Sequence, residues 1–135
     1  MGLFGFFSAK PKNRVALDLS KVKVDMHSHL IPGIDDGSQN MEETIAMLAK
    51  FEAIGFSKII TTPHIKHPSY PNSSANILDG LKEVREQMKL AGINLELEAA
   101  AEYYFDETLI EKIKNRDILT FGDNYVLFEF SFNHP

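Results

Sequence analysis

Apolar positions along this chain follow two alternating patterns: short runs that suit β-strands, and longer runs with the 3.6-residue period of an amphipathic helix. Three helices are predicted, over residues 41–54, 74–90 and 105–114. The helical period is clearest in the second of them, where one face carries Ile77, Leu81, Val84 and Met88. Four strands are predicted around these helices, over residues 22–27, 57–62, 94–101 and 125–130.

The predicted elements alternate along the chain, with a strand before and after each helix. Such alternation is typical of α/β proteins, in which right-handed crossovers join parallel strands. Ile59 and Ile60 are adjacent in the second strand, which suits a strand buried on both faces of a parallel sheet. We therefore expect an α/β domain of parallel βα units over residues 21–135, preceded by a tail or linker at residues 1–20.

Polar residues with metal-binding chemistry begin where the first predicted strand ends. His27 and His29 are two residues apart, and side chains at that spacing in an extended backbone point to one face. Asp25 shares their alternation, and the acidic pair Asp35 and Asp36 follows in a turn flanked by glycines. A single histidine is more often a surface or core residue than a ligand. This stretch alone therefore leaves the metal-binding and the structural interpretations open.

The later predicted strands each carry a further candidate ligand at or just past the carboxyl end. These candidates are His64, Glu102 and Glu129. In α/β folds the carboxyl ends of parallel strands meet at one edge, and that edge is where sites are built. Considered singly, Glu102 could be a solvated acid that follows a strand, and His64 could be a residue of a turn. Together with the two earlier histidines they predict a metal site.

The types of residue in this set restrict the metal and the chemistry. Imidazoles and carboxylates without thiolates suit Mn, Fe or Zn rather than Ca. The chain has no cysteine, which excludes a cysteine nucleophile. Paired metals bridged by a carboxylate suit hydrolysis by a metal-activated water. This reasoning does not select a phosphate ester over an amide as the substrate.

Charge and hydropathy exclude several classes of partner. The net charge of −5 argues against nucleic acid, because neutralising phosphates requires clustered Lys and Arg. No stretch approaches the ~20 apolar residues of a membrane span. The first twelve residues are apolar and then basic, which is the reverse of a secretory signal. A cytoplasmic location is therefore expected.

Several motifs carry a resemblance to a known family. They are DMHSHLIPGIDDGS at residues 25–38, TPH at 62–64, AEYY at 101–104 and LFEFS at 127–131. In this order they resemble the bacterial tyrosine phosphatases of the polymerase-and-histidinol-phosphatase (PHP) superfamily. The resemblance implies a manganese-dependent enzyme that dephosphorylates a bacterial tyrosine kinase and is linked to capsular and exopolysaccharide synthesis. It also implies the distorted (β/α)7 barrel of that family.

The same resemblance implies a set of metal ligands. His27, His29 and Glu102 would hold a first ion, and Glu102 would bridge to a second ion bound by Glu129. A third ion would take Asp36 and His64, with Asp35 as the alternative to Asp36. The complete site would hold two or three Mn²⁺ ions, with Fe or Zn as alternatives. No substrate-binding residue is assigned.

The matched region corresponds to the first half of the family's barrel. A closed βα barrel takes ~250 residues, and the family's later histidine ligands and phosphate-binding arginines have no counterparts here. We expect about half of a barrel, and self-association through its exposed edges. Two further functions stay open, another PHP-type phosphoesterase (histidinol-phosphate-like) and a catalytically silent metal-binding or interaction module.

Overall fold

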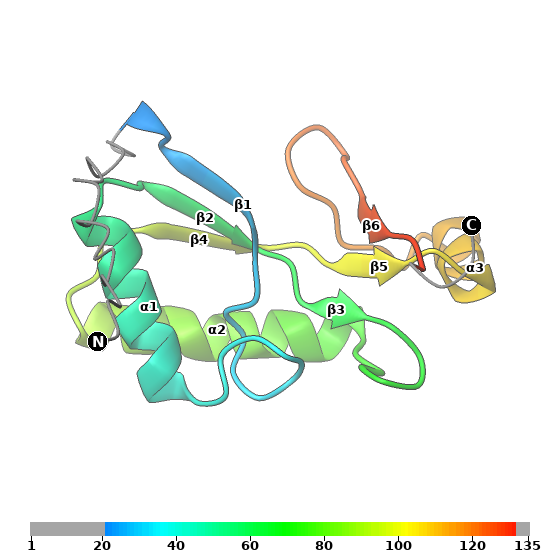
Figure 1. Ribbon diagram of the computed structural model, residues 1–135, viewed down its shortest axis with the longest axis horizontal. Coiled ribbons are helices and arrows are strands. Elements are labelled where there is room, and N and C mark those ends of the chain that lie inside the picture. Colours follow the sequence, from blue (N-terminus) through cyan, green and yellow to red (C-terminus); the bar gives the residue numbers. More distant parts are fainter. Residues whose placement is uncertain (1–20, 132–135) are drawn as a thin grey trace, which may run out of the picture.

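A computed structural model describes residues 21–131 and contains three helices and six strands in that range (Figure 1). The helices are α1 (Met41–Ala53), α2 (Ser74–Leu90) and α3 (Glu107–Asn115). The strands are β1 (Val24–Ser28), β2 (Lys58–Thr61), β3 (His64–Ile65), β4 (Glu96–Ala99), β5 (Glu102–Tyr104) and β6 (Leu127–Glu129). The predicted tail at residues 1–20 lies outside the described residues.

The strands form two separate three-stranded sheets, both entirely parallel. Their orders are β1-β2-β4 and β3-β5-β6. The α/β class and the parallel arrangement predicted from the sequence are therefore confirmed. Within the described range the two sheets do not close into a barrel.

The predicted strands over residues 57–62 and 94–101 correspond to β2 and β4, but the structure also contains two strands that were not predicted, β3 and β5. Strand β2 ends at Thr61, and β3 begins at His64 in the other sheet. In the same way β4 ends at Ala99, and the unpredicted strand β5 begins at Glu102 in the other sheet. Pro63 has no N–H to donate, which favours an interruption of the ladder between β2 and β3.

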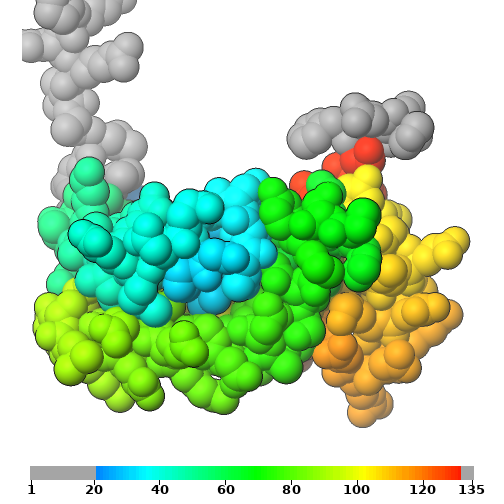
Figure 2. Space-filling view, turned by 90° about the horizontal axis from the view of Figure 1, so that it is seen from below, coloured from blue at the N-terminus to red at the C-terminus, as the bar shows by residue number. Residues whose placement is uncertain are grey.

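Helices α1 and α2 cover one face of the first sheet, as Figure 2 shows from below. Ile59 of β2 and Leu97 of β4 pack there against Leu48 of α1 and Val84 of α2. The N-terminus of α1 is capped by Asn40, whose side chain accepts a hydrogen bond from the Glu43 N–H at 2.9 Å. The Glu43 carboxylate accepts from the Gln39 N–H at 2.8 Å.

Helix α2 is long enough to hold both sheets. Its first turns place Ile77 in a second core under β3 and β5, with Tyr103 and Leu109, and its later turns enter the first core. Tyr103 is nearly fully buried, and its hydroxyl oxygen accepts a hydrogen bond from the Leu119 N–H at 2.7 Å. The position of one sheet relative to the other is therefore set by packing on a common helix (Figure 1).

Two apolar surfaces stay uncovered in the described residues. On the first sheet, Val24 and Met26 of β1 are exposed and line an open groove of about 490 Å³ together with Phe121. On the second, a cluster of exposed rings with centroids 5.1–5.6 Å apart consists of Phe105, Phe128 and Phe130. No helix in residues 21–131 is long and apolar enough to cross a membrane.

Candidate metal centre

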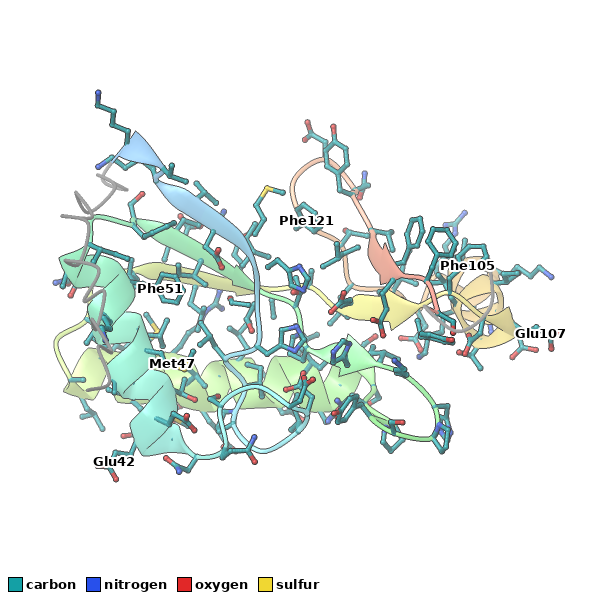
Figure 3. The ribbon with its side chains drawn as sticks, in the orientation of Figure 1. Glu42, Met47, Phe51, Phe105, Glu107 and Phe121 are labelled. Atoms are coloured by element: carbon teal, nitrogen blue, oxygen red, sulfur yellow. The ribbon has the colours of Figure 1, made fainter. Side chains whose placement is uncertain are left out.

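The candidate ligands meet at the junction between the two sheets. His27 lies near the end of β1, whereas His64 and Glu102 are the first residues of β3 and β5 and lie opposite each other in the ladder. Glu129 ends β6. Figure 3 shows nitrogen- and oxygen-bearing side chains converging at this junction. The structure thus brings these predicted residues together between the two sheets.

Strand β1 contains a bulge near its end, where His27 lies, and His29 follows just past that end. The ladder pairs Asp25 with Ile59 but Ser28 with Thr61, so three residues of β1 span two of β2. Directly paired residues share a face, so the extra residue reverses the alternation of side chains after Asp25. The expectation that Asp25 shares the face of His27 is therefore wrong, since Asp25 lies on the helix-covered face with Ile59.

One carboxylate oxygen lies at the centre of the site. Glu102 is only 7% exposed, and its Oε2 atom lies 3.2 Å from Nε2 of His27. The same oxygen lies 3.4 Å from Nε2 of His29 and 3.3 Å from Nδ1 of His64. Three imidazoles around one carboxylate oxygen provide a donor set for a divalent cation with a bridging carboxylate.

The candidate ligands form three overlapping groups whose donor atoms lie within 4.8 Å of one another. These groups are His27–His29–Glu102, His29–Asp36–His64 and His64–Glu102–Glu129. They contain all six candidate ligands predicted from the sequence, and His64 belongs to two of the groups. The structure thus brings the predicted residues together, while their binding of metal stays a prediction.

The adjacent acids Asp35 and Asp36 have different surroundings. Asp35 has a fully buried side chain, and its Oδ2 atom accepts from His29 Nδ1 at 2.8 Å and from the His64 N–H at 2.9 Å. Asp36 is exposed, with its Oδ1 atom 3.6 Å from His29 Nδ1 and 3.5 Å from His64 Nε2. The Asp35 carboxylate therefore accepts hydrogen bonds that orient the two histidines. Asp36 is the acid that is available as a ligand.

The buried pair of Asp35 and His29 is electrostatically coupled. The hydrogen bond from the imidazole to Asp35 is the main cause that raises the pKa of His29. Burial opposes ionisation of Asp35, but hydrogen bonds from His29, Gly37 and His64 together outweigh it and lower the pKa of the carboxyl. With Nδ1–H donated to Asp35, His29 turns its Nε2 toward Glu102, which is the usual orientation of a metal-binding histidine.

The loop after β1 is held by a close approach at Gly37. A Cβ atom at this position would lie 2.3 Å from both the Cβ and the carbonyl oxygen of His29. The next residue, Ser38, donates its N–H to that carbonyl at 3.1 Å, and its hydroxyl bonds the hydroxyl of Thr44 at 2.7 Å. Glycine is therefore required where the acidic loop folds back on the ligand strand.

One atom of the site lacks a hydrogen-bond partner within the protein. Nδ1 of His64 is buried and makes no hydrogen bond, although Glu102 Oε2 lies 3.3 Å away. A buried polar atom without a partner is costly, and a cation at this point would supply one. The residues present therefore fit a divalent cation.

Sequence reasoning missed the residues that surround His64. The Tyr70 ring stacks on the imidazole with centroids 5.2 Å apart, and the Asn72 amide donates to the His64 carbonyl at 2.8 Å. Lys66 donates to Oε1 of Glu129 at 2.9 Å, and this hydrogen bond raises the pKa of Lys66. The available sequence signal was the two-residue spacing of His64 and Lys66, which places both side chains on one face of an extended segment.

Comparison with known proteins identifies the family. Residues 23–135 match the sequence profile of the family described as capsular polysaccharide synthesis, CpsB/CapC, and the chain belongs to this family. The tyrosine-protein phosphatase CpsB of Streptococcus pneumoniae is 32% identical over 109 residues, which are 80% of this chain. The tyrosine-protein phosphatase YwqE of Bacillus subtilis is 27% identical over 112 residues, 82% of this chain.

A solved structure confirms the relationship at the level of the fold. It comes from work on YwqE of B. subtilis and CpsB of S. pneumoniae, described as metal-dependent tyrosine phosphatases, and superposes with a TM-score of 0.74 at 26% identity. The match covers 81% of this chain and 44% of that structure. The chain also spans 44–45% of the length of the two relatives, so the activity of whole relatives is not carried to it directly.

Proposed function

We propose that the cluster at the sheet junction binds two or three Mn²⁺ ions, with Fe or Zn as chemical alternatives. The proposal rests above all on Glu102, whose Oε2 atom lies within 3.4 Å of a ring nitrogen of each of three histidines. His27, His29 and Glu102 hold one ion, and Glu102 and Glu129 share a second. Asp36 and His64 take the third. The metal dependence described for the structurally similar phosphatases supports this assignment.

We further propose that the complete site hydrolyses phosphotyrosine in proteins. Bound divalent cations would supply an activated water and stabilise charge on the phosphoryl oxygens. The protein side chains hold the site in place: Asp35 fixes His29, and Tyr70 and Asn72 fix His64. The chain has no cysteine, which favours this route over a cysteinyl-phosphate intermediate.

The relatives support a proposal for the substrate and the partner. Both relatives named above are tyrosine-protein phosphatases, and the matched family is described by capsular polysaccharide synthesis. We infer that the substrate of this chain is a phosphotyrosine protein in the cytoplasm, specifically a bacterial tyrosine kinase that controls polysaccharide synthesis. The net charge of −5 is consistent with a protein rather than a nucleic-acid partner.

The direct test is phosphate release from three substrates by the Mn²⁺-loaded 135-residue chain. We expect turnover of a phosphotyrosine peptide, little turnover of the matching phosphoserine peptide or of histidinol phosphate, and loss of activity in Glu102→Gln. Preferred turnover of histidinol phosphate would instead support the alternative PHP-type phosphoesterase.

A second candidate function is a metal-binding module without turnover. It is favoured by one observation, that the chain spans only 44–45% of its relatives' length. A folded chain that binds Mn²⁺ but releases no phosphate from any of the three substrates would establish this function for the 135 residues.

A further inference from the structure

Lys66 brings a positive charge to the edge of the candidate metal centre. Among the lysines whose ion pairs the structure describes in residues 21–131, it is the one paired with a candidate ligand. Its Nζ atom lies 2.9 Å from Oε1 of Glu129 and 4.6 Å from the centre of the Tyr104 ring. The ammonium group is therefore held by one carboxylate and one aromatic face.

The oxygen that Lys66 contacts is also the one that faces the cluster. Glu129 Oε1 lies 3.8 Å from Nδ1 of His64, the buried nitrogen that has no hydrogen bond. Nδ1 of His64 lies in turn 3.3 Å from Glu102 Oε2. The ion that Glu102 and Glu129 share in the proposed centre would therefore compete with Lys66 for this carboxylate oxygen.

The backbone of Lys66 is held beside the site by hydrogen bonds, which keeps the site within reach of its side chain. Lys66 follows β3 directly, and its N–H and carbonyl pair with the carbonyl and N–H of Tyr70 at 2.9 and 2.7 Å. Tyr70 stacks in turn on His64. The Tyr104 ring, 4.6 Å from the ammonium group, offers a second contact at the rim of the cluster to a side chain that is released from Glu129.

Charge complementarity indicates which ligand the Lys66 ammonium group would bind once it is released from Glu129. The site gathers the carboxylates of Asp35, Asp36, Glu102 and Glu129, so a bare site repels a phosphate dianion. Once divalent cations neutralise these carboxylates, a freed ammonium group at the rim attracts phosphate oxygens. Charge-assisted hydrogen bonds of this kind are the strong ones.

We propose that Lys66 exchanges partners, pairing with Glu129 when the centre is empty and with a phosphoryl oxygen of the substrate when divalent cations hold Glu129. This proposal rests on the proposed phosphatase function. It makes Lys66 a substrate-binding residue whose availability depends on metal loading.

Two titrations by calorimetry test the exchange on the 135-residue chain, using Lys66→Gln, Lys66→Arg and the control Lys58→Gln. Lys58 makes its ion pairs with Glu96 and Glu98 of β4. In the first titration, with Mn²⁺ alone, Lys66→Gln should bind about two- to fivefold more tightly than the unchanged chain, because a competing partly exposed ion pair is removed. Lys58→Gln should match the unchanged chain.

In the second titration, inorganic phosphate is added to the Mn²⁺-loaded proteins. Lys66→Gln should lose about tenfold or more in phosphate affinity, because a hydrogen bond between charged groups is lost. Lys66→Arg should retain most of the affinity. Circular dichroism of each variant verifies that it is folded.

The possible results distinguish a failure of the Lys66 exchange from a failure of the proposed metal centre on which the exchange depends. Mn²⁺ binding in the unchanged chain, with unaltered or weaker Mn²⁺ affinity or unaltered phosphate affinity in Lys66→Gln, overturns the exchange and leaves the metal centre standing. Absence of Mn²⁺ binding in all folded proteins overturns both the metal centre and the exchange.

Discussion

His29 and Asp35 form a buried hydrogen bond of 2.8 Å between Nδ1 of the imidazole and Oδ2 of the carboxylate. Asp35 is fully buried and also accepts the N–H groups of Gly37 and His64. The acid therefore fixes one candidate ligand by its side chain and another by its backbone, without being a ligand itself.

Replacing Asp35 by Asn is expected to weaken Mn²⁺ binding by about 10- to 100-fold, because ligand orientation is lost while the ligands stay. Calorimetric titration measures the effect, and Asp79→Asn, at an exposed acid paired with Lys82, is the matched control. Equal Mn²⁺ affinity in Asp35→Asn and the unchanged chain would show that Asp35 has no orienting role.

Gly37→Ala is expected to destabilise the fold by about 3 kcal/mol, since the added Cβ would overlap both the backbone and the side chain of His29. Gly92→Ala is the control. Gly92 has a φ of +71° but no atom within 4 Å of an added Cβ, so only backbone strain of about 1 kcal/mol applies. Urea unfolding measures both variants. A smaller loss for Gly37→Ala than for Gly92→Ala would contradict the close packing of the loop on β1.

Asp117 links α2 to α3 and should titrate abnormally. Hydrogen bonds from Lys112 and then from Ser74 lower the pKa of its carboxyl below the ordinary 3.8. A lowered pKa in the folded state stabilises the fold above pH 3.8, and this contribution is lost as the pH falls through the lower folded value.

NMR titration of the Asp117 carboxyl carbon tests this assignment. Lys112→Met should move the pKa up toward 3.8, whereas Lys114→Met, on the same helix, should leave it in place. An Asp117 pKa at or above 3.8 in the unchanged chain would contradict the described hydrogen bonds.

The exposed rings of Phe105, Phe128 and Phe130 lie beside β6, whose outer edge pairs with no other strand within residues 21–131, and such an edge favours pairing with another chain. We predict that the 135-residue chain self-associates through this surface, with a second copy as the partner. In analytical ultracentrifugation the Phe128→Ser, Phe130→Ser double variant should shift toward the 15.2 kDa monomer. Leu90→Ser, at the exposed end of α2, should not. A monomeric unchanged chain would refute the prediction.

The helices were predictable from the sequence because the apolar pattern that specifies each helix lies within the helix itself. The apolar period over residues 74–90 predicted α2 with its bounds. The two-residue strand β3 has no periodicity of its own. It exists because His64 pairs with Glu102, which is distant in the chain, and no local pattern reports that pairing.

The sequence predicted which residues form the candidate site, but it did not predict how they are arranged. All six candidate ligands gather, but the face of Asp25 depends on a bulge that is set by the pairing of β1 with β2. Asp35 and Asp36 are adjacent and chemically identical, so only the folded loop distinguishes the orienting acid from the exposed one. The spacing of His64 and Lys66 was a signal for Lys66, but the contact of Tyr70 with His64 depends on the backbone bridge between Lys66 and Tyr70.

The measurement that tests the central claim most directly is metal content per chain, by elemental mass spectrometry, for protein purified without chelator or nickel. The account predicts one or more Mn, Fe or Zn ions per unchanged chain, and loss of these ions in folded Glu102→Gln. It predicts retention in Glu98→Gln, a β4 carboxylate that pairs with Lys58. Equal metal content in Glu102→Gln and the unchanged chain, or a folded unchanged chain free of metal after incubation with Mn²⁺, would contradict it.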